Sequence, residues 1–276
     1  MSVSLRPPYP WPNTNGLLPG KTVIVTGSST GIGRAIAITA AKNGANVVLH
    51  HLGDSTLDDV TEVKSHVEAA GMKAIVVAGD ISDPETATKI VSSAVSTFSR
   101  IDVLFSNAGI CPFHTFLDLP HSLWKRVQDV NLNGSFYVTQ AVANVMAKQE
   151  PDVTTGQRGA IVATSSISAL MGGGEQTHYT PTKAGIKSFM ESCAIALGPL
   201  RIRCNSVLPG SIETAINIED LSNLEKRRDQ ERRVPLERLG EPFDIAGPAV
   251  FFASDLAKYV NGASLLVDGG MAISLQ

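Results

Sequence analysis

Seven short apolar segments rich in β-branched residues alternate with longer helical stretches, and this alternation constrains the fold more than any other feature. The strand signals fall at about residues 21–26, 45–51, 73–79, 101–106, 159–165, 201–208 and 263–268. The helical patterns fill the gaps at about 32–43, 55–71, 84–99, 121–148, 179–198 and 243–255. Because strands separated by helices are joined by right-handed crossovers, the pattern predicts one α/β domain with a doubly wound, seven-stranded parallel sheet and helices on both faces.

Three glycines link the first strand to the first helix. They lie in Gly27-Ser28-Ser29-Thr30-Gly31-Ile32-Gly33, between the apolar run and an alanine-rich helical segment. Glycines at such a junction let the backbone approach a pyrophosphate, and the helix N-terminus supplies unpaired amides and a positive dipole end. The spacing G-x-x-x-G-x-G differs from the general fingerprint G-x-G-x-x-G. Its place between a first strand and a first helix still favours a dinucleotide site in a Rossmann fold.

A second group of residues indicates proton transfer. Tyr179 and Lys183 are four residues apart in Y-T-P-T-K, so they project from one face of a helix. A nearby ammonium stabilises a phenolate and lowers the pKa of a tyrosine from its ordinary value of about 10, which suits acid–base work near neutral pH. Ser166 lies thirteen residues before Tyr179, and Asn131 lies thirty-five residues before Ser166. The pair alone is typical of surface residues, but a cofactor signal in the same chain favours the proton-transfer interpretation.

Taken together, these motifs resemble the short-chain dehydrogenase/reductase family. The matching stretches are T-G-S-S-T-G-I-G at 26–33, G-D-I at 79–81, S-N-A-G at 106–109, N-L-N-G at 131–134, T-S-S at 164–166, Y-T-P-T-K at 179–183, L-P-G at 208–210 and V-D-G-G at 267–270. They follow the order and spacing of the family from about residue 20 to the end. The resemblance implies one dehydrogenase domain over residues 19–276, with a lid that contains a short amphipathic helix at about 212–241.

The resemblance also implies a role for each residue of the proton-transfer group. Tyr179 would be the acid or base, Lys183 would lower its pKa and hold the nicotinamide ribose, and Ser166 would hydrogen-bond the reacting oxygen. Asn131, in a locally distorted helix, would hold a water that links Lys183 to solvent. The plainer alternatives are a strand-end cap for Ser166 and a buried helix residue for Asn131. The residues implied to bind the cofactor are Gly27, Ser29, Thr30, Gly31, Ile32, Gly33, His51, Asp80, Ile81, Asn107, Ala108, Gly109, Tyr179, Lys183, Pro209, Gly210, Ile212 and Thr214.

The sequence leaves the choice between NAD and NADP open. The tip of the second strand reads Leu49-His50-His51-Leu52 and lacks the acidic residue that usually binds the adenosine ribose of NAD. Enzymes of this family that use NADP often carry a basic residue where this chain has Thr30. Use of both cofactors is the prediction, with a slight lean to NAD because no arginine or lysine is positioned for a 2′-phosphate. A strong preference for NADP would indicate that one of the two histidines contacts the 2′-phosphate.

Polar residues near the predicted site favour a hydroxylated small-molecule substrate. The predicted substrate residues are Ser166, Ser168, Gln176, His178, Tyr179, Glu213 and Asn217. Within the family, T-G-S-S-T-G and G-S-I-E-T-A-I-N resemble bacterial glucose 1-dehydrogenases. Much of the second half, including Q-T-H-Y-T-P-T-K-A-G-I, is more similar to fungal L-rhamnose 1-dehydrogenases. This implies oxidation of the anomeric hydroxyl of an aldose, L-rhamnose first, to a lactone. The alternatives are an NADPH-dependent 3-oxoacyl-acyl-carrier-protein reductase and, outside enzymes, a nucleotide-sensing regulator.

Composition narrows the partners and the compartment. A formal charge of −3 gives no reason to expect nucleic acid or an anionic membrane, and the apolar runs are shorter than the ~20 residues that span a bilayer. Residues 1–18 are proline-rich and lack the apolar segment of a signal peptide, so we expect a flexible extension. The three cysteines suit neither a disulfide scaffold nor a metal site, and an odd number suits a reducing cytoplasm. The resemblance implies a homotetramer.

Overall fold

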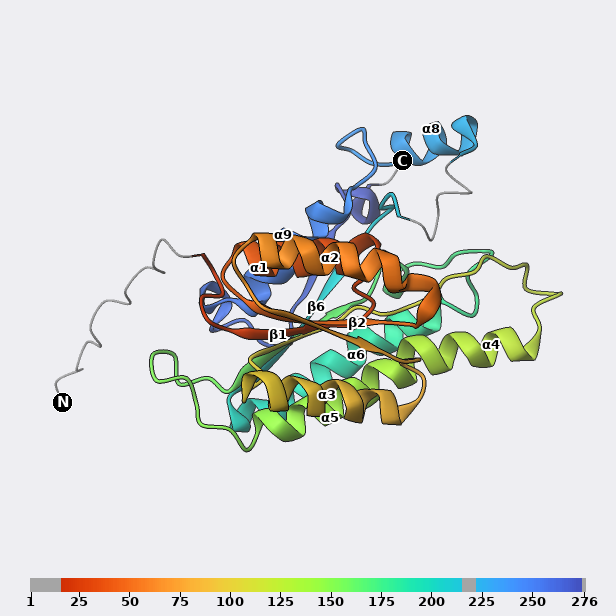
Figure 1. Ribbon diagram of the computed structural model, residues 1–276. Coiled ribbons are helices and arrows are strands. Elements are labelled where there is room, and N and C mark those ends of the chain that lie inside the picture. Colours follow the sequence, from red (N-terminus) through yellow and green to blue (C-terminus); the bar gives the residue numbers. More distant parts are fainter. Residues whose placement is uncertain (1–15, 215–221, 275–276) are drawn as a thin grey trace.

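The computed structural model describes residues 16–214 and 222–274, which form a layered α/β structure (Figure 1). All pairs of neighbouring strands are parallel, and the seven-stranded sheet has the order β3-β2-β1-β4-β5-β6-β7. The predicted doubly wound fold is therefore confirmed. The strands are β1 (Thr22–Val25), β2 (Asn46–His51), β3 (Ala74–Ala78), β4 (Val103–Ser106), β5 (Gly159–Thr164), β6 (Ile202–Pro209) and β7 (Ser264–Val267).

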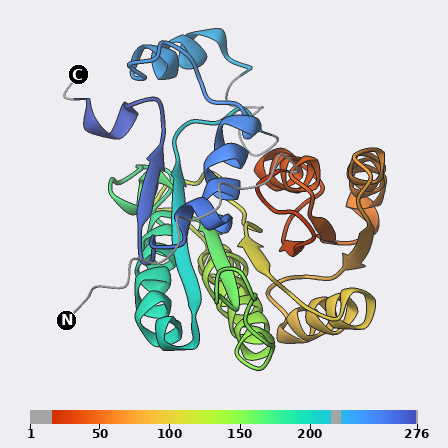
Figure 2. The same cartoon turned by 90° about the vertical axis from the view of Figure 1, so that its left-hand side faces the viewer.

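Helices cover both faces of the sheet, and the view along the sheet in Figure 2 separates the two layers. One layer contains α1 (Gly31–Lys42), α2 (Leu57–Ala69) and α9 (Pro242–Ala253). The opposite layer contains α3 (Pro84–Phe98), α5 (Gly134–Met146) and α6 (Thr180–Leu197). Each layer has its own cluster of buried apolar side chains against the sheet. Strands buried on both faces explain why their sequences are continuous apolar runs.

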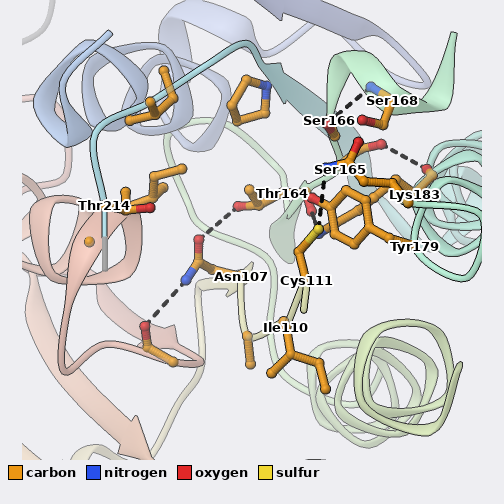
Figure 3. Close-up of a pocket in the computed structure, with 18 of the residues that line it drawn as sticks. Asn107, Ile110, Cys111, Thr164, Ser165, Ser166, Ser168, Tyr179, Lys183 and Thr214 are labelled. Atoms are coloured by element: carbon orange, nitrogen blue, oxygen red, sulfur yellow. Dashed lines mark hydrogen bonds between the residues drawn. The ribbon is translucent and has the colours of Figure 1, made fainter. Parts of the chain in front are cut away.

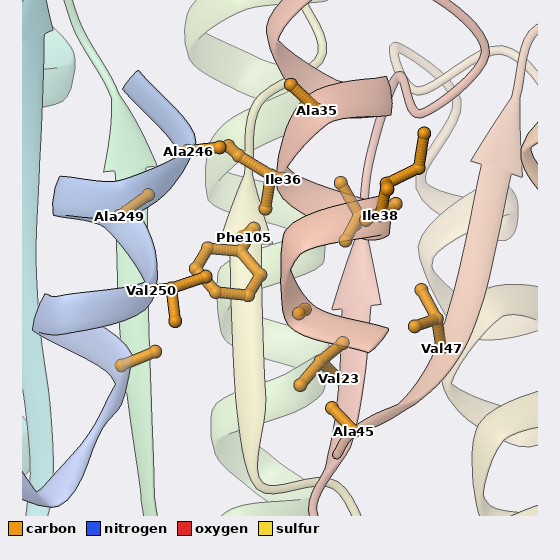
Figure 4. Close-up of a cluster of buried hydrophobic side chains, with 14 of the residues drawn as sticks. Val23, Ala35, Ile36, Ile38, Ala45, Val47, Phe105, Ala246, Ala249 and Val250 are labelled. Atoms are coloured by element: carbon orange, nitrogen blue, oxygen red, sulfur yellow. The ribbon is translucent and has the colours of Figure 1, made fainter. Parts of the chain in front are cut away.

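Small side chains let α1 and α9 pack closely beside each other over β4. Ala246, Ala249 and Val250 of α9 lie against the side of α1 that carries Ile36, above the ring of Phe105 (Figure 4). Phe105 is 1% exposed, and burial of one such side chain contributes about 1.5–3 kcal/mol. This packing fixes the start of α1, where the glycine-rich loop ends.

The predicted helix over 121–148 is interrupted near Asn131. The structure divides it into α4 (His121–Val127), a π-helical segment (Gln128–Asn133) and α5. A π-helical turn inserts one extra residue per turn and often accompanies a functional residue. The local distortion that the family resemblance implied is present at the expected place.

The start of the folded domain differs from the sequence prediction. Leu18, which was assigned to the extension, is 1% exposed, and its backbone N–H donates to the Asn43 carbonyl at 2.9 Å. The folded domain therefore starts before residue 19, and residues 1–15 of the predicted extension lie outside the described chain.

The short helix α8 (Leu224–Arg232) forms inside the predicted lid, but it is polar rather than amphipathic. None of its residues is buried, and Leu224 is 68% exposed. Figures 1 and 2 show α8 standing apart from the two layers. Among the helices that the structure describes, none has the length and apolar character needed to cross a membrane.

Candidate active site

A cavity of about 600 Å³ opens at the carboxyl ends of the strands, where ligands bind in doubly wound sheets. Its size lies within the range of small-molecule sites. Most residues of the predicted cofactor site line it: Gly27, Ser29, Thr30, Gly31, Ile32, Asp80, Ile81, Asn107, Ala108, Gly109, Pro209, Gly210, Ile212 and Thr214. Ser166, Ser168, Gln176, Tyr179 and Lys183 line the same cavity. The structure thus brings the two sequence signals into one site.

The N-terminus of α1 forms one end of the cavity. Thr30 occupies the N-cap position without a capping side-chain hydrogen bond, and the first turn carries no acidic residue. A Cβ on Gly33 would lie 2.1 Å from the carbonyl oxygen of Gly27, so only glycine allows the loop to fold back on the helix. Uncapped amides at a positive dipole end fit the pyrophosphate of a dinucleotide.

Asn107 joins three strand ends beneath this loop. Its amide nitrogen donates to the carbonyls of Thr26 and Gly27 at 3.1 and 3.3 Å, and its amide oxygen accepts from the Thr164 hydroxyl at 3.1 Å (Figure 3). The backbone N–H groups of Asn107 and Ala108 both donate to the Thr26 hydroxyl. These contacts fix the loop after β4 against β1 and β5.

Tyr179, Lys183 and Ser166 meet at the other end of the cavity (Figure 3). The ammonium of Lys183 donates to the Thr164 carbonyl at 2.8 Å and lies 5.5 Å from the centre of the Tyr179 ring. Ser166 follows β5, and its hydroxyl oxygen accepts the N–H of Ser168 at 3.0 Å. Tyr179 is the N-cap residue of α6, so helix geometry places Lys183 one turn further on the same face.

Asn131 is fully buried behind this group and does not line the cavity. Its amide oxygen accepts the N–H of Ile110 at 2.8 Å, while its amide nitrogen donates to the Ile110 carbonyl and to the Thr182 hydroxyl. A Cβ on Gly109 would lie 3.2 Å from the Asn131 amide oxygen and 3.5 Å from the Lys183 ammonium. The π-helical segment therefore places Asn131 close to Lys183.

Comparison with known proteins agrees with this geometry. A family model described as Enoyl-(Acyl carrier protein) reductase matches residues 27–272. The L-rhamnose 1-dehydrogenase (NAD(P)(+)) of Sphingomonas sp. (strain SKA58) is 56% identical over 260 residues, which cover 94% of this chain and 99% of the relative. The solved short-chain type dehydrogenase/reductase of Mycobacterium marinum is 30% identical with a TM-score of 0.84, covering 92% of this chain and 96% of that one. The chain belongs to the short-chain dehydrogenase/reductase family.

The likeness to L-rhamnose 1-dehydrogenases is likewise confirmed. The L-rhamnose-1-dehydrogenase of Scheffersomyces stipitis is 53% identical over 263 residues, which cover 95% of this chain and 99% of the relative. The alignments span nearly the whole length of both chains. The motifs quoted from the second half of the sequence are thus part of a similarity that runs through the whole short-chain dehydrogenase/reductase domain.

Burial changes the protonation of the central pair in this short-chain dehydrogenase/reductase. Burial raises the pKa of Tyr179 well above its ordinary range, the neighbouring Cys111 thiol adds to this, and a hydrogen bond with Ser166 opposes it. Burial also lowers the pKa of Lys183 to about 8. The sequence argument from spacing considered only the attraction of a cation and predicted a lowered tyrosine pKa. Desolvation is instead the largest influence on the pKa of this phenol.

Several predicted residues lie outside the cavity lining. His178 is fully buried, and its Nε2 is 2.7 Å from the Pro112 carbonyl. Glu213 forms an ion pair with Arg227 of α8, and His51 contacts the Thr56 hydroxyl at 3.0 Å. Gly33 acts through the loop rather than the cavity surface, and Asn217 lies outside the described residues.

His50 is a site residue that the sequence interpretation missed. Its Nδ1 accepts the N–H of Gly27 at 3.2 Å, and its Nε2 lies 2.9 Å from the Gly79 carbonyl. Because Nδ1 is an acceptor, the proton is on Nε2. Burial lowers the pKa of His50 to about 4, so the ring stays neutral at physiological pH. The only signal in the sequence was its place at the strand tip.

Other cavity residues come from segments that no motif marked. They include Cys111, Phe113, Met171, Gln230, Arg233 and Met271. Cys111 and Phe113 follow S-N-A-G in the same loop, so proximity to a motif could have identified them. Gln230 and Arg233 lie in or next to α8, in a charged run that is usually a solvated surface.

Proposed function

We propose that this protein is an NAD(P)-dependent aldose 1-dehydrogenase that oxidises L-rhamnose at its anomeric carbon and forms the lactone. The observation that carries this proposal is 56% identity across nearly the full length of an L-rhamnose 1-dehydrogenase, with Tyr179, Lys183 and Ser166 together in one cavity. In the overall reaction, the sugar loses a hydride and a proton and the cofactor is reduced.

The chain supplies the groups that this reaction needs. Tyr179, ionised to the phenolate, takes the proton of the anomeric hydroxyl and becomes the phenol, since its side chain lies in the cavity with Ser166 and Lys183. Ser166 donates a hydrogen bond to the reacting oxygen and fixes its orientation. Lys183 holds the nicotinamide ribose and, as a buried ammonium, favours the phenolate while the proton is transferred. Asn131 orients a water next to Lys183, through which the proton reaches solvent.

The residues present fit a nicotinamide dinucleotide. The uncapped N-terminus of α1 and the glycine-rich loop suit its pyrophosphate, and Asp80 and Ile81, which line the same cavity, would meet its adenine. Pro209, Gly210 and Thr214 also line the cavity and would flank the nicotinamide. The bound cofactor supplies the hydride acceptor, and the chain excludes water and orients the sugar beside it.

We propose that the protein uses both cofactors and slightly prefers NAD. The cavity residues that follow β2 are Leu52 and Thr56, which neither repel a 2′-phosphate nor bind it as a cation would. The name of the Sphingomonas relative includes both cofactors, which supports dual use. Both histidines already have hydrogen-bond partners, which disfavours either ring as a phosphate ligand.

The remaining parts of the proposal concern the lid, the assembly and the compartment. Gln230 and Arg233 support a lid over the substrate, because both line the cavity from the α8 region.

Exposed apolar side chains on α5, α6 and β7 support a homotetramer: Phe136, Ile195 and Leu265 are 41%, 81% and 38% exposed. Sedimentation as a monomer would contradict this assembly. The three free cysteines support a cytoplasmic protein.

The test is a panel of aldoses assayed with NAD and with NADP, in which reduction of the nicotinamide is followed by absorbance. We expect L-rhamnose to give the highest kcat/KM and the lactone to be detectable as the product. The runner-up is a keto reductase. If no aldose is oxidised while acetoacetyl thioesters are reduced with NADPH, the ranking is reversed. Reversible nucleotide binding without turnover of any of these substrates would favour a regulator.

A further inference from the structure

Two loops form a connected wall at the substrate end of the cavity. One consists of residues 111–114 after β4, and the other of residues 175–178 before α6. Three hydrogen bonds join them. Gln176 donates from Nε2 to the Cys111 sulfur at 3.3 Å, His114 donates its N–H to the Glu175 carbonyl at 3.0 Å, and the His178 ring contacts the Pro112 carbonyl at 2.7 Å. We call residues 111–114 and 175–178 the two-loop wall.

Cys111 occupies the inner end of the two-loop wall, close to the reacting groups. Figure 3 shows its sulfur beside the ring of Tyr179. The residue lines the cavity although it is only 8% exposed. Burial raises the pKa of its thiol to about 11, so the sulfur is a neutral thiol at physiological pH. A neutral, buried thiol is a poor nucleophile but can accept a hydrogen bond.

Gln176 receives its orientation from both sides. On one side its amide nitrogen is bonded to Cys111. On the other side its amide oxygen lies against Gly173, where an added Cβ would be only 2.5 Å away. Among the residues that the structure describes, the side chain of Gln176 makes no other hydrogen bond. A planar amide has two N–H donors and an oxygen acceptor, so it retains hydrogen-bonding capacity toward a ligand.

We propose that Cys111 is a positioning residue that orients the amide of Gln176 toward a ring hydroxyl of the sugar substrate. This inference rests on the proposed aldose dehydrogenase activity and adds how the sugar is selected. The amide contacts a hydroxyl away from the anomeric carbon, while Tyr179 and Ser166 hold the reacting one. A fixed amide that hydrogen-bonds a hydroxyl discriminates against an analogue without it, because its own polar atoms are then left unpaired.

The central experiment compares Cys111→Ala, Cys111→Ser and Cys193→Ala with the wild-type enzyme. Cys111→Ala removes the acceptor, so we expect KM for L-rhamnose to rise roughly tenfold, with KM for the cofactor and kcat changed less than about threefold. Cys111→Ser restores an acceptor and should recover most of the loss. Cys193→Ala is the matched control, because Cys193 is half-buried on α6 and does not line the cavity.

A second comparison separates positioning from general packing. The single variant Gln176→Leu and the double variant Cys111→Ala/Gln176→Leu should have equal KM values for the sugar, because Cys111 acts only through Gln176. Wild type should bind mono-deoxy analogues of the sugar with a higher KM than L-rhamnose. For one analogue this difference in KM should largely disappear in the Gln176→Leu variant, and the hydroxyl that this analogue lacks is the one that Gln176 recognises. Additive effects of the two substitutions, or an unchanged KM in Cys111→Ala, would overturn the inference.

The same assay distinguishes this inference from the proposed function. If the wild-type enzyme oxidises L-rhamnose and the Cys111 variants behave like it, only the positioning role fails. If the wild-type enzyme oxidises no aldose, the proposed function fails and the inference falls with it. Thermal unfolding of each variant shows whether a loss of activity reflects a loss of folding.

Discussion

The ammonium of Lys183 lies 5.5 Å from the centre of the Tyr179 ring and is held there by a 2.8 Å hydrogen bond to the Thr164 carbonyl. The strand end therefore fixes the position of the cation, and the turn of α6 fixes the position of the phenol. Lys183 is buried and Tyr179 is half-buried at the cavity, so a phenolate formed on Tyr179 would be only weakly screened from the ammonium by water. This rigid pair is the structural basis of the acid–base role that we propose for Tyr179.

Replacement of Tyr179 by phenylalanine tests that role directly. The ring and its packing remain, but the proton acceptor is lost. We expect kcat for sugar oxidation to fall by about 10³-fold, a size typical of a lost general base, while the affinity for NAD changes little. Steady-state assays and a fluorescence titration with NADH measure the two effects. Tyr259→Phe is the control, because Tyr259 is fully exposed. Near-normal turnover of Tyr179→Phe would contradict the assignment.

The sequence predicted the sheet well because a parallel sheet covered on both faces requires continuous apolar strands. The predicted strand at 45–51 and the observed β2, Asn46–His51, differ by one residue. The prediction failed at the start of the folded domain, which is determined by tertiary contacts. Leu18 is buried only because the chain folds back onto Asn43, and no local pattern shows this.

The candidate site was predictable in its motifs and not in its surroundings. Tyr179, Lys183 and Ser166 follow from spacing, since strand ends and helix turns place them. The burial of His178 and the bridging role of His50 depend on which carbonyl each ring meets, and spacing does not encode that. The pKa of Tyr179 was predicted with the wrong sign because a sequence pattern contains the neighbouring charge but not the desolvation.

Gly33→Ala tests the close approach of the glycine-rich loop to α1. The added methyl would lie 2.1 Å from the Gly27 carbonyl oxygen and 2.6 Å from the Asn107 amide nitrogen, so the backbone must shift. We expect the free energy of unfolding to fall by about 1–3 kcal/mol and the affinity for NAD to fall strongly. Urea unfolding and nucleotide titration measure these effects. Gly247→Ala on α9 is the control, because its Cβ would meet nothing within 4 Å. Equal behaviour of the two variants would refute the close-approach argument.

Arg203→Met tests how the end of α9 is held. The Arg203 guanidinium, only 5% exposed, donates to the carbonyls of Phe252 at 2.7 Å and Ser254 at 3.2 Å. Helix ends leave such carbonyls without partners inside the helix. In Arg203→Met these carbonyls lose their buried donor, which should lower the free energy of unfolding by on the order of 3 kcal/mol. Arg228→Met, on the exposed surface of α8, should change it by less than about 0.5 kcal/mol. An equally small change for Arg203→Met would show that water replaces the guanidinium.

The pH dependence of stability should reveal the buried imidazole of His50. Burial lowers its pKa from 6.5 to about 4, with smaller opposing effects of a hydrogen bond to Gly79 and the charge of Asp80. At a pH between these two pKa values, His50 binds a proton in the unfolded chain but not in the folded chain. The contribution of His50 to the free energy of unfolding is therefore complete above pH 6.5 and decreases as the pH falls toward 4.

His50→Gln isolates this contribution from the carboxylates and from His51, whose pKa burial also lowers. The difference in free energy of unfolding between wild type and variant should be about 2 kcal/mol larger at pH ~7.5 than at pH ~5. Urea unfolding at the two pH values measures it, with His66→Gln on the exposed surface of α2 as the matched control. The prediction is contradicted if the free energies of unfolding of wild type and His50→Gln differ by the same amount at both pH values. His50 would then titrate as freely in the folded protein as in the unfolded chain, and the Gly27–His50–Gly79 bridge would not keep it neutral.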